Sequence, residues 1–321
     1  MSRASALYLG LPIAVIALAA LSLFVGVANL RPGALWSDPE ALRLLAISRI
    51  PRTFAALLTG GAMAVAGVIM QMLVRNRFVE PGTAGTAQGA ALGILGVTLL
   101  APALPLFFKM IVASVSALLS MLLFLALIRK IPPRAPLLVP LVGLVYSGVI
   151  GAAVTFIGYQ TDLLQYVEIW MNGEFSGVIS GRYELLWLAG GMAIAAYVTA
   201  DQFTIAGLGR DASVNLGLNY RQVVALGLAV VSMTTALVVV TVGMIPFVGL
   251  VVPNIVARLM GDNLRASLPM VACLGGAMVL GCDILGRVLR FPYEVPVGTV
   301  FGVLGAAVFL WLLFMRPAHA R

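Results

Sequence analysis

The chain has 321 residues, of which 61% are hydrophobic and only 10% are charged, and its mean hydropathy is +1.07. Soluble domains carry about 25% charged residues, so these proportions exclude a soluble protein of this length. A helix crosses a bilayer with about 20 apolar residues, whereas the strands of a membrane β-barrel alternate in character over about 10 residues. The long apolar stretches therefore predict an all-α, polytopic membrane protein.

Ten stretches are expected to cross the membrane, and together they make residues 1–321 a single transmembrane domain. In chain order they cover residues 7–28, 53–73, 84–101, 107–128, 137–158, 183–200, 221–242, 246–260, 268–286 and 296–315. The first stretch is too long for the apolar part of a signal peptide, so we interpret it as a spanning helix. The stretch 246–260 is short and contains Pro253, and such a segment is tolerated where protein or water surrounds it.

The distribution of basic residues favours one orientation in the membrane. If both termini lie in the cytoplasm, that side holds 12 of the 20 Lys and Arg residues but only four acidic residues. The opposite side holds eight basic and eight acidic residues. Because Lys and Arg favour cytoplasmic loops, we expect both termini in the cytoplasm. We assign the net charge of +8 to orientation rather than to nucleic-acid binding.

Two arginines, Arg49 and Arg52, stand just before the second span, at its outer end. One interpretation is that they anchor the helix by extending their side chains to the membrane surface. The alternative is a docking site, because arginine binds carboxylates of another protein through paired hydrogen bonds. Arg287, at the outer end of the ninth span, is a candidate third docking residue, although Asp283, one turn earlier, can also pair with it.

A polar loop at residues 71–82 joins the second and third spans on the expected cytoplasmic side. It can be an ordinary connection. However, Gly85, Gly89 and Gly93 follow it at four-residue spacing, which favours close approach of another helix. A close-packed helix that follows a polar loop is alternatively a gate.

Small residues also share one face of the fifth span, at Gly143, Ser147 and Gly151. Such a face usually serves helix packing. The alternative is that it forms the smooth wall of a wide pathway.

A second polar segment, residues 208–217, is bounded by glycines and lies between two spans on the expected cytoplasmic side. Asp211 can cap a short helix there, and Gly217 can end it. A short exposed helix contributes nothing to a membrane core, so we interpret it as a contact surface for a cytoplasmic partner.

Other classes of protein find little support in the sequence. No G-x-x-x-x-G-K-[ST] motif is present, so ATP binding by a P-loop is excluded. For an intramembrane enzyme, the only histidine is His319 in the tail, and no metal-ligand cluster or nucleophile–base pair is visible. An ion-coupled secondary transporter usually places ionisable residues near the midplane, and the nearest candidate, Asp283, lies toward a helix end.

Taken in order, these segments resemble the permease family that serves ABC importers of iron-siderophore complexes, haem and vitamin B12. The matching patterns are R-x-P-R, a Gln-containing helix end that runs into R-N, an acid-Pro-Gly step, L-G-x-x-x-x-x-x-L-G, G-x-x-x-F-V-G-L-x-x-P, D-x-x-x-R and P-x-E-x-P-x-G. They extend from about residue 45 to residue 305. The resemblance implies the type II ABC importer permease fold and a transport subunit that is not itself an enzyme.

The resemblance also implies roles for individual residues. Arg49, Arg52 and Arg287 match the positions that dock a periplasmic binding protein, and Asn76 and Phe78 match the cytoplasmic gate. A coupling helix at about residues 207–219 would contact the ATPase. Its central residues are Gly209, Arg210, Asp211, Ala212, Ser213, Val214, Asn215, Leu216 and Gly217.

The family assembles two permease subunits with two ATPase subunits in the bacterial inner membrane. The resemblance thus implies no cofactor or metal in this chain, because ATP is bound by the partner. It implies a second permease subunit, which we expect to differ in sequence, with a homodimer as the alternative. A periplasmic siderophore-binding protein would deliver the ferric siderophore.

The sequences of two segments, residues 75–79 and 83–86, resemble those of a subgroup that imports catecholate or petrobactin-like siderophores. Vitamin B12 and haem are the alternative cargoes. The chain departs from the family where Asn-Arg-Phe replaces the usual Asn-Pro-Leu at residues 76–78 and Pro-Asn replaces Pro-His at residues 253–254. Asp211 stands where Glu is common.

Overall fold

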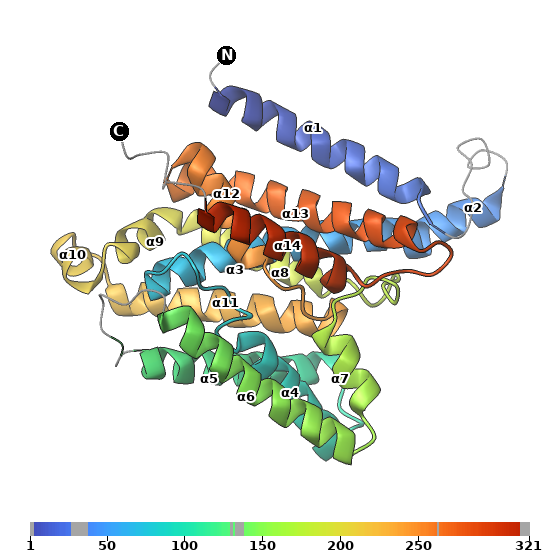
Figure 1. The fold of residues 1–321 in the computed structure, drawn as a ribbon, viewed down its shortest axis with the longest axis horizontal. Helices are drawn as coiled ribbons and strands as arrows, with labels where there is room; N and C mark the ends of the chain where they lie inside the picture. Colours follow the sequence, from blue (N-terminus) through green and yellow to red (C-terminus); the bar gives the residue numbers. More distant parts are fainter. Residues whose placement is uncertain (1–2, 27–37, 129–130, 132–137, 262, 315–321) are drawn as a thin grey trace.

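The computed structural model describes residues 3–26, 38–128, 131, 138–261 and 263–314 (Figure 1). Within these residues the chain folds into helices joined by short connections, and the only β-type pairing is an isolated bridge between Arg290 and Tyr293. The expected all-α fold is therefore confirmed. His319 and the ends of three expected spans, residues 27–28, 137 and 315, lie outside the described residues.

The helices follow one another from the blue to the red end of the ribbon in Figure 1. They are α1 (Arg3–Phe24), α2 (Pro39–Leu44), a π-helical turn (Leu45–Arg49), α3 (Ile50–Val74), α4 (Thr86–Leu100), α5 (Leu106–Ile128), α6 (Leu138–Gln160), α7 (Leu164–Met171), α8 (Leu186–Val198), α9 (Ala200–Gly207), α10 (Arg210–Asn215), α11 (Tyr220–Val242), α12 (Val248–Met260), α13 (Leu264–Leu289) and α14 (Val297–Phe314).

Helix α3 lies at the centre of the bundle, where it packs against α8, α11, α12 and α13. Most of its residues after Pro51 are buried. Glycines make this packing possible, because Gly60 faces the backbone of Gly275 and Gly67 faces the backbone of Gly249 so closely that a methyl group would collide. Small residues of this kind let helix backbones touch in a membrane, where van der Waals packing drives association.

The helices α5 and α6 lie at the edge of the bundle and leave much of their apolar surface uncovered. On α6, for example, Val145 and Phe156 are each 63% exposed. Because lipid tails or another membrane subunit can cover such a surface, it fits a helix at the margin of a membrane protein.

Five helical stretches are long and apolar enough to cross a membrane. They are Pro39–Val74, Leu106–Ile128, Leu138–Gln160, Tyr220–Val242 and Leu264–Leu289. Five shorter apolar helices fall on the remaining expected spans, so every expected stretch contains an apolar helix. The number of ten crossings stays a prediction, because length and composition alone do not show that the short helices cross.

Helix boundaries differ from the expected ones at two places. The helix that contains the second span begins at Pro39, before residue 53, because α2 and the π-helical turn continue into α3. The sixth stretch is divided at Thr199, whose hydroxyl donates a hydrogen bond to the carbonyl of Ala195 and whose backbone leaves the helical conformation. Beyond this break, α9 leads to α10.

The start of α1 and the end of α14 lie toward the same end of the bundle as α10 (Figure 1). We call this the α10 end, and the opposite one, which carries α2, the α2 end. An even number of crossings would produce this arrangement. The side of the membrane on which the α10 end lies stays a prediction.

Candidate functional site

At the α2 end, four charged side chains form one network. The Asp283 carboxylate on α13 pairs with Arg52 on α3 through an Nη2–Oδ1 distance of 2.7 Å. Its other oxygen pairs with Arg287, one turn later on α13, also at 2.7 Å, which confirms the pairing expected for these two residues. Arg52 also pairs with Glu294 in the segment before α14, at 2.9 Å. Since Asp283 and Arg287 are only 2% exposed, this is a buried ion network.

The same network holds the end of α1. Arg287 donates hydrogen bonds to the backbone carbonyls of Ser22 and Val25 at 3.0 and 2.7 Å, and Arg49 donates to Val25 at 2.6 Å. The last carbonyls of a helix lack partners within the helix and attract positive charge. The buried side chains of these arginines therefore fasten α1, α3 and α13 together. Their docking role stays a prediction.

At the α10 end, the loop between α3 and α4 (residues 75–85, here the gate loop) holds both predicted gate residues. Asn76 is buried, and its side-chain oxygen accepts a hydrogen bond from the backbone N–H of Phe78 at 2.9 Å. The Phe78 ring meets Phe309 of α14 edge-on, with ring centroids 6.1 Å apart. The gate loop thus lies between α14 and the start of α12.

Sequence reasoning missed Glu80, in the same loop. It is only 4% exposed, and its carboxylate accepts a hydrogen bond from the backbone N–H of Phe247 at 2.9 Å. The acid-Pro-Gly step in this loop was a usable signal, because a carboxylate that becomes buried requires polar partners. The identity of the partner was not accessible, since it lies 167 positions along the chain.

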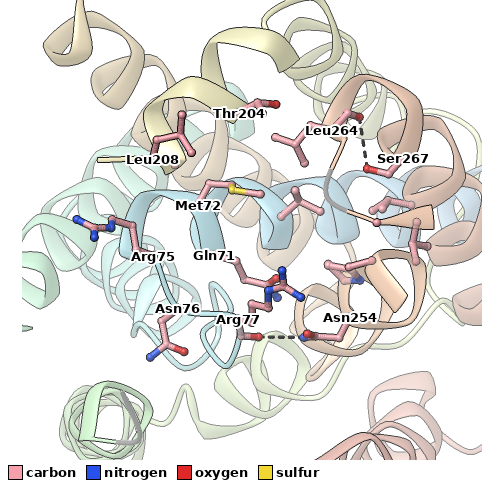
Figure 2. Close-up of a pocket in the computed structure, with 17 residues that line it drawn as sticks. Gln71, Met72, Arg75, Asn76, Arg77, Thr204, Leu208, Asn254, Leu264 and Ser267 are labelled. Atoms are coloured by element: carbon pink, nitrogen blue, oxygen red, sulfur yellow. Dashed lines mark hydrogen bonds between the residues drawn. The ribbon is translucent and has the colours of Figure 1, made fainter. Parts of the chain in front are cut away.

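A cavity of about 420 Å³ opens beside the gate loop (Figure 2). The gate loop and α12 contribute Asn76, Arg77 and Asn254 to one side, and α9 and the residue that follows it contribute Thr204 and Leu208 to another. Figure 2 also shows that the side-chain amide of Asn254 donates to the backbone carbonyl of Arg77, at 2.9 Å. The cavity therefore separates the gate loop from the helix that leads to α10.

Helix α10 stands away from the bundle (Figure 1) and exposes an apolar surface. Leu208, Val214 and Leu216 are 62%, 56% and 63% exposed. Ser213 faces inward, is fully buried, and donates to the carbonyls of Gly209 and Ile205, which ties α10 to α9. The predicted coupling segment is thus an exposed helix that is fixed to its neighbour.

Of the two residues expected to bound α10, the structure confirms Gly217 at its end but not Asp211 at its start. Gly217 follows the helix in a left-handed conformation, with φ of 79°, and so ends it as predicted. The prediction that Asp211 caps the helix is wrong, because Gly209 is the cap residue and Asp211 lies in the first turn. An acidic side chain in that position still favours the positive end of the helix.

The small residues of α6 serve helix packing in this structure. Gly143 and Ser147 are buried, and Gly143 lies against the backbone of Thr83 and the ring of Phe124. Gly151 lies close to the side chain of Gln88 on α4. A role of these residues in lining a pathway stays a prediction.

The sequence of the chain matches a known protein family and several of its characterised members. Residues 14–315 match the sequence profile of the FecCD transport family. The chain is 47% identical to the petrobactin import system permease protein YclN of Bacillus subtilis, over 96% of this chain and 98% of that protein. It is 41% identical to the ferric-anguibactin transport system permease protein FatD of Vibrio anguillarum, over 92% and 95% of the two chains. It is 32% identical to the vitamin B12 import system permease protein BtuC of Vibrio cholerae, over 97% and 93%.

Solved structures agree at the level of the fold. An inward-facing metal-chelate type ABC transporter superposes with a TM-score of 0.81 at 23% identity, covering 97% of this chain and 99% of the other. PsaBC from Streptococcus pneumoniae gives a TM-score of 0.60 at 14% identity, covering 89% and 95%. The chain belongs to the FecCD transport family, whose members are membrane permease subunits of ABC importers and not enzymes.

Proposed function

We propose that this chain is the permease subunit of an importer that carries iron-siderophore complexes of the catecholate or petrobactin type across the bacterial inner membrane. The observation that carries the proposal is the 47% identity, over nearly full length, with a permease named for petrobactin import. The relative named for vitamin B12 is 32% identical, which makes B12 the less favoured cargo. A secondary transporter is disfavoured because Asp283 is committed to two arginines and is not available to a coupling ion.

The ATPase partner would bind at the α10 end, which places that end in the cytoplasm. Support comes from the exposed apolar residues on and beside α10 and from the buried Ser213 that fixes α10 to α9. A rigid connection would pass a displacement of α10 to the bundle. ATP and the binding protein would act by preferring different permease conformations, because a ligand shifts an equilibrium only by its differential affinity for the two states.

The gate would be the loop that contains Asn76 and Phe78, and it would separate the pathway from the cytoplasm. The pathway would lie between this chain and a second permease subunit, which we expect to differ in sequence. The uncovered apolar faces of α5 and α6 leave room for lipid and for that subunit.

The periplasmic binding protein would dock at the α2 end. Arg49, Arg52 and Arg287 already have partners within the chain, so a docking carboxylate would compete with them. Glu294 is the acid that such a carboxylate would displace most easily, because its side chain is 26% exposed, against 2% for Asp283.

The proposal is tested by iron uptake in cells that lack this chain. Radiolabelled iron is offered as separate complexes with petrobactin, a catecholate siderophore, a hydroxamate siderophore and citrate, and haem and vitamin B12 are tested in parallel. We expect loss of uptake for petrobactin or the catecholate alone, and recovery when the chain is restored. Loss confined to vitamin B12 or haem would overturn the cargo assignment.

A further inference from the structure

Glu80 occupies a position that no role assigned above explains. It lies in the gate loop, yet its carboxylate reaches the first residues of α12, where it accepts the N–H of Phe247 at 2.9 Å. The backbone N–H groups of Gly249 and Leu250 face the same carboxylate. Phe247 is the residue before α12, has a left-handed backbone with φ of 66°, and offers no side-chain cap of its own.

The Glu80 carboxylate and the start of α12 supply each other with hydrogen-bond partners. The first turn of a helix leaves backbone N–H groups without partners, and the helix dipole favours negative charge there. A buried carboxylate, in turn, is costly without hydrogen-bond donors. Glu80 therefore serves α12 as the N-terminal cap that its own sequence does not provide.

Further contacts join the gate loop to α12 on the same side. The amide of Asn254, on α12, donates to the carbonyl of Arg77 at 2.9 Å. Gln71, near the end of α3, donates to the carbonyl of Gly249 at 3.1 Å. Within the loop, the Thr83 hydroxyl accepts from the Glu80 N–H and also lies 3.0 Å from the Glu80 carbonyl, to which it donates. The gate loop is thus attached to the α12 segment at Glu80 and Arg77, and the end of α3 is attached to it at Gln71.

The cavity described above lies on one side of the gate loop and α12. In Figure 2, Thr204 of α9 and Leu208, which follows α9, lie across the cavity from Asn76 and Arg77. A displacement of α9 can therefore take up the open volume while the contacts between the gate loop and α12 remain.

We propose that Glu80 is a positioning residue that caps α12 from the gate loop, so that the loop and α12 change position as one unit when the pathway opens. This inference rests on the proposed gate, which contains Asn76 and Phe78. It adds the residue that holds the gate in place and the helix with which the gate moves.

The test measures how freely the gate loop moves in the full-length chain in opened membrane vesicles. Cys273 and Cys282 are replaced by alanine, and Arg77→Cys, at an exposed loop position, provides the only thiol. The rate of its reaction with a soluble maleimide is compared among the parent, Glu80→Ala and Glu80→Gln. Glu168→Ala, at an exposed position on α7, is the matched control.

We expect Glu80→Ala to raise the labelling rate about tenfold or more. The substitution removes the hydrogen bonds that keep the loop against α12, and losing hydrogen bonds to a carboxylate changes such an equilibrium by about this factor. Glu80→Gln should stay within about threefold of the parent, since its amide oxygen still accepts a hydrogen bond. Glu168→Ala should have no effect. Unchanged labelling in Glu80→Ala, or equal rates for the alanine and glutamine variants, would overturn the proposal.

Two additions separate this result from misfolding and from the choice of cargo. The same labelling at Tyr166→Cys, exposed on α7, should not respond to Glu80→Ala; a rise of equal size there means general loosening and overturns the proposal. If the alanine variant does not accumulate, Glu80→Asp replaces it with an expected rise in the same direction, because its carboxylate lies one methylene farther from Phe247. Labelling needs no cargo, so the cap can hold even if the proposed cargo is wrong.

Discussion

The charged residues at the α2 end hold helices together at the same positions that are proposed to dock a partner. Asp283 neutralises Arg52 and Arg287, while Arg287 also binds the end of α1. Removing one member of a buried ion network leaves the others without compensation, which is far more costly than losing an exposed pair. The residues expected to dock a partner are therefore also the residues that hold this end of the bundle together.

The structural part of this role predicts a large effect of Asp283→Asn on stability. This substitution removes the negative charge that neutralises the buried guanidinium groups of Arg52 and Arg287. We therefore expect a loss of about 3–5 kcal/mol in the free energy of unfolding. Thermal unfolding of the purified chain in detergent measures it. Asp201→Asn breaks an exposed pair with Arg265 and serves as control, with an expected loss of at most about 1 kcal/mol. Equal effects of the two substitutions would show that the network is not structural.

At this scale, sequence spacing predicted only the local contact. Asp283 and Arg287 are four positions apart on a helix, so their pairing follows from helix geometry. Arg52 and Asp283 are separated by 231 positions, and Glu80 and Phe247 by 167. Nothing in the spacing of such residues indicates that they meet, because the packing of whole helices brings them together.

Among the elements, α3 determines how closely the others approach. Its glycines match glycines on α12 and α13, at Gly67 with Gly249 and at Gly60 with Gly275. The backbones touch at both places, so the surface of α3 is shaped for these two neighbours. A side chain at either contact must push one helix away from the other.

This contact predicts opposite results for two glycine substitutions. Gly67→Ala should destabilise the chain by about 1–3 kcal/mol, because the added methyl group overpacks the contact with α12. Gly191→Ala, on α8 with open space around it, should be neutral or stabilising, because alanine favours a helix by about 1 kcal/mol. Thermal unfolding of both variants provides the measurement. Destabilisation by both, or by neither, would contradict the packing described for α3.

The apolar helices were predictable from the sequence because hydropathy and length specify them. The short helices were less accessible. Helix α7 has eight residues, which is too short to cross a bilayer, so hydropathy and length do not distinguish it from a loop. Helix α10 is predictable because glycines stand on both sides of it. Its first residue is not, because Asp is a favoured N-cap residue and Asp211 therefore indicates a later start than the observed cap at Gly209.

For the whole molecule, the two ends of the bundle have different chemistry. The α2 end is closed by a buried charge network that joins α1, α3 and α13. The α10 end carries exposed apolar residues on and beside α10, a cavity of about 420 Å³ and the gate loop. A displacement that begins at α10 therefore passes through α9, which borders this cavity on one side and packs on α3 and α13 on another.

The most direct test of the central claim is ATP-dependent accumulation of radiolabelled ferric petrobactin in liposomes. The liposomes contain this chain, its second permease and its ATPase, and enclose ATP, and the binding protein is supplied outside. We predict accumulation with the parent chain and a loss of at least about tenfold with Leu216→Asp, which places a charge on the exposed apolar surface beside α10. Tyr293→Asp, 71% exposed at the α2 end, leaves the surface beside α10 unchanged, so co-purification of the ATPase should fall with Leu216→Asp and not with Tyr293→Asp. No accumulation with the complete parent assembly, or full accumulation with Leu216→Asp, would contradict this account.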